Sequence, residues 1–150
     1  MNSENTINAL NNLVKKNNDR FEGYESASKL TDEQDLKNLF GNLANTSKRN
    51  NLELSDEILK MRGQPTENTN ATGKFFRAWM DVKAALTGND RKSILNSCEY
   101  GEGKAIDTYE NVLKDDRGHL SRDQQSLIHE QQVLIKADHN KVKLLIAVQA

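Results

Sequence analysis

The chain repeats apolar residues with the spacing of an α-helix in four long stretches. Because successive helical residues are about 100° apart, the apolar residues of each stretch fall on one face. The pattern predicts helices over residues 6–28, from the Thr31–Gln34 capping box to Gly63, over residues 90–114, and from Ser121 onward. In the first helix the expected apolar stripe runs through Ile7, Leu10, Val14, Phe21 and Tyr24.

A fifth, shorter helix is expected between the second and third long ones. Residues 64–73 are polar and predict a loop, and residues 74–86 form an amphipathic pattern that carries Phe75, Phe76 and Trp79. A connection of this length allows the second and third long helices to run parallel. The sequence therefore predicts an all-α, ferritin-like four-helix bundle with a short crossover helix between the second and third long helices, in a single domain over residues 1–150.

Polar residues interrupt each apolar stripe near its centre. Antiparallel packing brings central positions to a similar depth, which is where helical bundles build cofactor sites. Three interpretations are open: a hydrogen-bonded layer that fixes the register of the helices, solvent-facing residues, or a partial metal site. The interrupting residues are Asn17 in the first long helix, Ser47 and Asn50 in the second, Glu102 in the third, and Gln131 and Asp138 in the fourth.

Glu102 is the most informative of these residues because it lies in the middle of the apolar face of its helix. A buried carboxylate has to be paired, protonated or bound to a metal. We expect partners such as Asn17, Gln131 or His139. With such partners, Glu102→Gln is mild and Glu102→Ala lowers the free energy of unfolding by about 1–3 kcal/mol.

Glu99 and His139 are the neighbouring candidates for a site with Glu102. Glu99 precedes Glu102 by three residues, so that both carboxylates can reach one cation, and the alternative is a solvated Glu99. His139 is either a hydrogen-bonded histidine at the edge of the core or a partner for Glu102. Cys98, one turn before Glu102, is expected to be a small core residue.

A complete di-iron site is not expected from this sequence. Such a site takes a Glu from each of two helices and a Glu-x-x-His motif from each of the other two. None of the three histidines has a glutamate three residues before it. Asp19 and Glu22 lie roughly 100–180° away from the stripe of the first helix, so we expect them at the surface or at its boundary.

Charge and composition exclude several classes of protein. Acidic and basic residues are interspersed and give a formal charge of −1, so neither nucleic acid nor a membrane surface is an expected partner. No apolar run approaches the roughly 20 residues that cross a bilayer, and the first residues lack the order of a secretory signal. A single cysteine excludes an internal disulfide. We expect a cytoplasmic protein.

Three stretches resemble a family of small bacterial ferritin-like four-helix-bundle proteins described as a domain of unknown function. They are residues 18–24 (Asn-Asp-Arg-Phe-Glu-Gly-Tyr), residues 79–88 (Trp-Met-Asp-Val-Lys-Ala-Ala-Leu-Thr-Gly) and residues 98–102 (Cys-Glu-Tyr-Gly-Glu), with weaker support from residues 137–139. The likeness extends from about Leu10 to Leu145. It implies a ferritin-like bundle and no particular reaction.

The resemblance also implies a set of metal-site residues. Glu22, Glu99, Glu102 and His139 match the pattern of the family. Phe21 and Thr46 stand where many members carry polar or acidic residues, and Asp138 replaces a residue that is usually small, so the implied ligand set is incomplete.

Two functions from different classes follow as expectations. The first is a soluble, non-enzymatic, stress-associated or interaction protein that acts as a homo-oligomer and needs no cofactor, because no complete catalytic arrangement is visible. The second is a bundle that binds iron or another divalent metal weakly, or uses it for redox chemistry, at Glu102, Glu99, His139 and Glu22.

Overall fold

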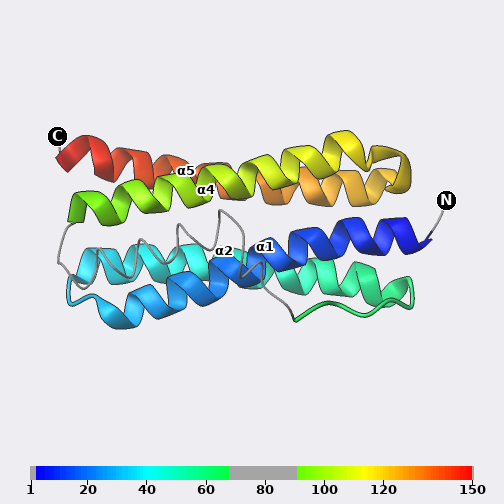
Figure 1. The fold of residues 1–150 in the computed structure, drawn as a ribbon, viewed down its shortest axis with the longest axis horizontal. Helices are drawn as coiled ribbons and strands as arrows, with labels where there is room; N and C mark the ends of the chain where they lie inside the picture. Colours follow the sequence, from blue (N-terminus) through cyan, green and yellow to red (C-terminus); the bar gives the residue numbers. More distant parts are fainter. Residues whose placement is uncertain (1–2, 68–90, 150) are drawn as a thin grey trace.

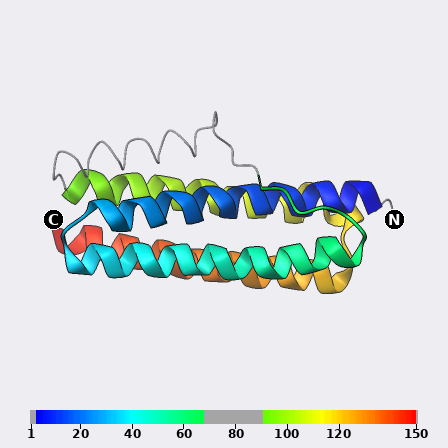
Figure 2. The ribbon, with the colours of Figure 1, turned by 90° about the horizontal axis from the view of Figure 1, so that it is seen from below.

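The computed structural model describes residues 3–67 and 91–149, and within them the protein is a bundle of four long helices. The α1–α2 hairpin packs along the α4–α5 hairpin, and all four helices lie nearly along one axis (Figures 1 and 2). The described part contains no strand, so the predicted all-α four-helix bundle is confirmed. The expected short helix with Phe75, Phe76 and Trp79 lies outside the described residues. The elements are α1 (Ser3–Leu30), α2 (Gln34–Lys60), α4 (Arg91–Asp115), the short 3₁₀ turn η1 (Arg117–His119) and α5 (Arg122–Gln149).

Helices α2 and α4 run parallel, so the turns of the two hairpins lie at opposite ends of the bundle (Figure 1). At each end of the bundle, side-chain contacts join the two hairpins. At one end Arg91, the first residue of α4, pairs with Asp35 and Glu33 at the start of α2. At the other end the side chain of Thr6 in α1 donates a hydrogen bond to the carbonyl of His119 in η1. Helix α4 therefore begins at the end of the bundle opposite to the one where α2 ends, which is the parallel order that the length of the connection allows.

The segment that follows α2 is held along α1 by asparagine side chains. Asn11 donates a hydrogen bond from Nδ2 to the carbonyl of Gln64 (3.1 Å) and accepts one at Oδ1 from the backbone of Thr66 (2.9 Å). Two turns further, Asn18 donates to the carbonyl of Thr66 (3.2 Å). These amides replace the backbone partners that an irregular segment lacks.

The buried positions of each long helix follow a heptad spacing, alternating steps of three and four residues. This spacing places residues of all four helices on the common axis of the bundle and defines the core. The buried positions with this spacing are 10, 13, 17, 20, 24 and 27 in α1; 36, 40, 43, 47, 50 and 54 in α2; 95, 98, 102, 105, 109 and 112 in α4; and 124, 128, 131, 135, 138 and 142 in α5.

The helix ends differ in part from the expected caps. Helix α2 begins at Gln34 with Glu33 as its N-cap, and Thr31 instead accepts a hydrogen bond from the backbone of Glu33 (3.2 Å). The start of α5 does form a reciprocal cap, in which the backbone N–H of Ser121 and that of Gln124 each bond to the side chain of the other residue (2.9 and 3.1 Å).

Helix α2 ends in a Schellman arrangement, in which the N–H of Gly63 bonds to the carbonyl of Ile58 (2.9 Å). The left-handed position of this motif belongs to Arg62 (φ 62°). A Cβ atom at Gly63 would lie 2.8 Å from the side chain of Ile7, so a larger residue there would require that side chain to move.

Candidate functional site: two buried polar layers

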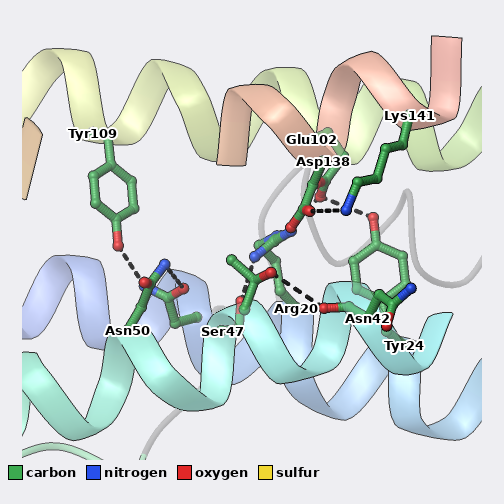
Figure 3. Close-up of polar contacts among 11 residues, drawn as sticks. Arg20, Tyr24, Asn42, Ser47, Asn50, Glu102, Tyr109, Asp138 and Lys141 are labelled. Carbon is green, nitrogen blue, oxygen red and sulfur yellow. Dashed lines mark hydrogen bonds and ion pairs between the residues drawn. The ribbon is translucent and has the colours of Figure 1, made fainter. Parts of the chain in front are cut away.

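A buried ion pair between Arg20 of α1 and Glu102 of α4 lies at the centre of the bundle (Figure 3). Arg20 Nε donates to Glu102 Oε2 (2.9 Å) and Arg20 Nη2 donates to Glu102 Oε1 (2.7 Å). Both side chains are fully buried. This bidentate geometry is the strongest common form of a charge-assisted hydrogen bond, and it gives both oxygens of the carboxylate a donor.

Side chains from all four helices complete this arrangement, which we call the charged layer (Arg20, Tyr24, Ser47, Glu102 and Asp138). Arg20 also donates to Ser47 Oγ of α2 (2.5 Å) and to Asp138 Oδ2 of α5 (3.3 Å). Tyr24 donates its hydroxyl hydrogen to Glu102 Oε2 (2.8 Å). Lys141, which is largely exposed, lies 3.8 Å from Asp138 Oδ1 at the edge of the layer.

A second set of buried side chains, the amide layer, adjoins the charged layer and also uses all four helices (Asn17, Asn50, Tyr109 and Gln131). Asn50 donates to Asn17 (3.3 Å), Asn17 donates to the hydroxyl of Tyr109 (2.8 Å), and that hydroxyl donates to Gln131 (2.7 Å). Gln131 returns to the backbone carbonyl of Asn50 (3.1 Å). The result is a closed hydrogen-bonded ring.

Burial and the charge of Glu102 act on the pKa of Arg20 in opposite directions and on the pKa of Tyr24 in the same direction. Burial alone would lower the pKa of Arg20, but the charge and hydrogen bonds of Glu102 outweigh it and raise that pKa above its ordinary value. Burial raises the pKa of Tyr24 well above its ordinary value, and the charge of Glu102 raises it further. Arg20 therefore stays charged and Tyr24 stays neutral.

The surroundings of Asp138 in the charged layer disfavour its ionised form. Burial raises its pKa above the ordinary value of 3.8, and the charge of Glu102 acts in the same direction. A hydrogen bond with Thr46 and the charge of Arg20 oppose that rise without cancelling it. The charged layer therefore holds one buried cation, which is paired with Glu102, and a second carboxylate whose pKa is raised.

The charged layer offers no open position for a ligand. The position central to the four helices is filled by the guanidinium of Arg20, which makes four hydrogen bonds. No three His, Cys, Asp or Glu side chains of the described residues come close enough together to hold a metal ion. Cys98 lies beside the layer. Burial raises the pKa of its thiol, and the charge of Glu102 raises it further, so the thiol stays protonated.

The structure separates the predicted site residues into three places. Glu102 is buried and bound to Arg20 and Tyr24. Glu99 and His139 come together at the edge of the bundle, where Glu99 Oε1 lies 3.8 Å from His139 Nε2. Glu22 is exposed, on the opposite side of α1 from the core. Asp19, expected at the surface or boundary, is buried at 5% exposure.

All six predicted interruptions of the apolar stripes are buried: Asn17, Ser47, Asn50, Glu102, Gln131 and Asp138. The hydrogen-bonded layer is therefore the interpretation that holds, and the solvent-facing alternative is wrong. The expected partners of Glu102 are also wrong, because Asn17 and Gln131 bond within the amide layer and His139 lies beside Glu99. Since the partner is a buried cation, the structure leads us to expect that Glu102→Gln destabilises the protein, in place of the mild change expected from the sequence.

Arg20 is the functional residue that the sequence reasoning missed. The expected stripe ran through Val14 and Phe21, which places Arg20 off the core. The heptad positions 10, 13, 17, 20, 24 and 27 put it on the core face, between Asn17 and Tyr24. The signal was the 3-4 spacing itself, which the other polar interruptions already followed.

Fold and site together define an α-helical bundle with a closed polar centre. The model of the domain-of-unknown-function family DUF2383 matches residues 5–115, from α1 to the end of α4. The chain therefore belongs to the DUF2383 family. A search of curated proteins finds no significant match to it. None of the helices that the structure describes has an apolar stretch long enough to span a lipid bilayer.

The raised pKa of Asp138 predicts a pH dependence of stability. The folded state holds this proton more tightly than the unfolded state, so the free energy of unfolding falls as the pH rises from 3.8 to the folded-state pKa. Asp138→Asn keeps the shape and removes the titration. We expect the variant to lose this fall and to be more stable than the parent above that range. Chemical denaturation between pH 3.5 and 8 checks this, with the exposed Asp107→Asn as the control that keeps the parental profile. A variant that is less stable than the parent at every pH would contradict the assignment.

Proposed function

We propose that this protein is a ferritin-like bundle without catalytic activity, which acts through its surface as an interaction protein and assembles with copies of itself. The observation that carries the proposal is the position of Arg20. Bundles of the ferritin type place metal between carboxylates at the centre of four helices. Here the guanidinium of Arg20 lies between two carboxylates at that depth. Its Nη2 atom is 2.7 Å from Glu102 Oε1 and 3.3 Å from Asp138 Oδ2, so the protein supplies its own cation.

The topology supports the ferritin-like part of this proposal. Two antiparallel hairpins with parallel second and third long helices require one long crossover, which is the connection of ferritin-like bundles. Arg91 beside Asp35 and Glu33 fixes that parallel order.

Exposed apolar side chains support the interaction role. None of the residues that the structure describes supports a stress-associated role. Leu30, Leu144 and Val148 are 55%, 67% and 77% exposed. They lie at the end of the bundle where α1 and α5 both end (Figure 1). Large exposed apolar side chains are available for protein contacts, and a second copy of the chain is the partner we propose for this end.

A second candidate function, weak metal binding, is favoured by one observation at the edge of the bundle. His139 Nε2 is buried and makes no hydrogen bond to any residue that the structure describes, and Glu99 Oε1 lies 3.8 Å from it. Both line a hollow of about 400 Å³, together with Asn96. A divalent cation between the imidazole and the carboxylate would satisfy the unpaired nitrogen, with Glu102 and Glu22 outside the site.

Metal titration separates the two candidates. For the first, we expect protein purified without chelator to contain no stoichiometric metal and to bind no equivalent of Fe²⁺ or Zn²⁺, measured by elemental analysis and calorimetry. One bound equivalent that Glu102→Gln abolishes would contradict the first proposal. Binding that survives Glu102→Gln and is lost in His139→Gln, with the exposed His129→Gln unchanged, would support the second.

The oligomer is tested by charge placed on the apolar end. We expect light scattering over a concentration series to show self-association. Leu144→Glu should weaken it by about tenfold or more, because burying a charge at a contact costs more than 1.4 kcal/mol. Leu59→Glu is the matched control at the other end of the bundle, where Leu59 is 57% exposed. A parent protein that stays monomeric throughout the series would refute this part of the proposal.

A further inference from the structure

A groove runs between α4 and α5 on the outside of their hairpin, near the turn. We call it the hairpin groove and define it by Leu113 and Lys114 on α4, Arg117 in η1, and Arg122, His129 and Lys136 on α5. Its volume is about 940 Å³. Arg122 and Lys136 are 14 residues apart on one helix, so the groove is about 21 Å long.

Four cations line this groove without an ion-pair partner. Lys114, Arg117, Arg122 and Lys136 are exposed, and none of them forms an ion pair within the described ranges 3–67 and 91–149. Of the two carboxylates that line the groove, Glu110 accepts a hydrogen bond from Gln132 (2.8 Å). The groove is thus locally basic in a chain whose formal charge is −1.

Helix stability does not explain the cation at the turn. Arg122 is the first residue of α5, where the helix dipole disfavours a positive side chain. The acids at the end of α4, Asp115 and Asp116, line a different hollow on the α1 side, with Lys16. Charges of opposite sign are therefore separated on the two sides of the α4 end, and they do not neutralise one another.

The turn end of the groove is held in a fixed shape. Gln125 donates hydrogen bonds to the carbonyls of Leu120 (3.1 Å) and Arg117 (3.4 Å). The reciprocal cap between Ser121 and Gln124 fixes the start of α5 on the same turn. The backbones that carry Arg117 and Arg122 are therefore positioned before any ligand arrives, which lowers the entropic cost of binding.

We propose that the hairpin groove binds an acidic segment of a partner protein in an extended conformation. At about 3.3 Å per residue, six or seven residues would span the groove. Glu110 and Glu130 would repel a uniformly charged chain such as polyphosphate or nucleic acid, but a peptide can place carboxylates opposite the cations only. Leu113 gives a half-buried apolar contact between the cations, which suits a peptide with apolar residues among its acids.

The probe for this proposal is a fluorescein-labelled synthetic peptide that repeats Asp, Leu and Gly, measured by fluorescence anisotropy against the full chain. We expect binding that weakens as salt is added, because exposed charges carry it. The double variant Arg117→Glu/Lys136→Glu should bind about tenfold more weakly or not at all. Amide chemical-shift changes should map to α4 and α5 around the turn.

The matched control carries the same charge change elsewhere. Lys48→Glu/Arg49→Glu alters two exposed cations on α2 and should leave the affinity unchanged. Equal weakening in both double variants, or equal binding of a peptide with Asn in place of Asp, would overturn the proposal. Tight binding of polyphosphate with no binding of the peptide would also overturn it.

This inference rests on the proposed function only in requiring a protein partner. The apolar end with Leu144 lies at the opposite end of the bundle from the groove, so its variants do not touch the peptide contact. Self-association without peptide binding would reject the groove alone. Peptide binding by a protein that stays monomeric would reject the oligomer and keep the groove.

Discussion

The buried pair between Arg20 and Glu102 is the interaction on which the arrangement of this bundle depends. It joins α1 to α4, and so it joins one hairpin to the other. The two hairpins touch each other much less than the helices within each hairpin touch. Apolar contacts allow one helix to shift along another at low cost, whereas a buried bidentate ion pair forms in only one relative position of the two helices. The pair therefore fixes how the hairpins dock, whatever its net contribution to stability.

Three further polar contacts in the core act across the same boundary. Arg20 reaches Asp138, Asn17 reaches Tyr109, and Gln131 reaches the backbone of Asn50. Each of these bonds crosses from the α1–α2 hairpin to the α4–α5 hairpin. A shift of one hairpin by a single turn would leave several buried donors and acceptors unpaired at about 1–3 kcal/mol each. Two adjoining layers thus define one register more sharply than the apolar core alone.

The sequence was sufficient for the four long helices, for the polar centre and for the parallel order of α2 and α4. It was not sufficient for the partners within that centre. Burial of Asn17 or Gln131 follows from periodicity, but which side chain Glu102 meets depends on how two hairpins meet, and that is a tertiary property. Arg20 was overlooked because a stripe through Phe21 looked more apolar, although only the heptad spacing aligns α1 with the other three helices. The separation of Glu99 from Glu102 has a related cause. Glu99 follows the core residue Cys98 by one position, about 100° around the helix, so its carboxylate lies at the rim while Glu102 lies on the axis.

A double-mutant cycle on the central pair tests this account most directly. Arg20→Met and Glu102→Leu each remove the bidentate partner of the other buried charge and should each lower the free energy of unfolding by about 3 kcal/mol. The double variant replaces the pair by apolar groups and should lose clearly less than the sum, with a coupling energy of at least about 1 kcal/mol. Urea unfolding of the four proteins at one pH measures all of these values. Additive losses would mean that the two side chains do not depend on each other, and the pair could not then be what fixes the docking of the hairpins.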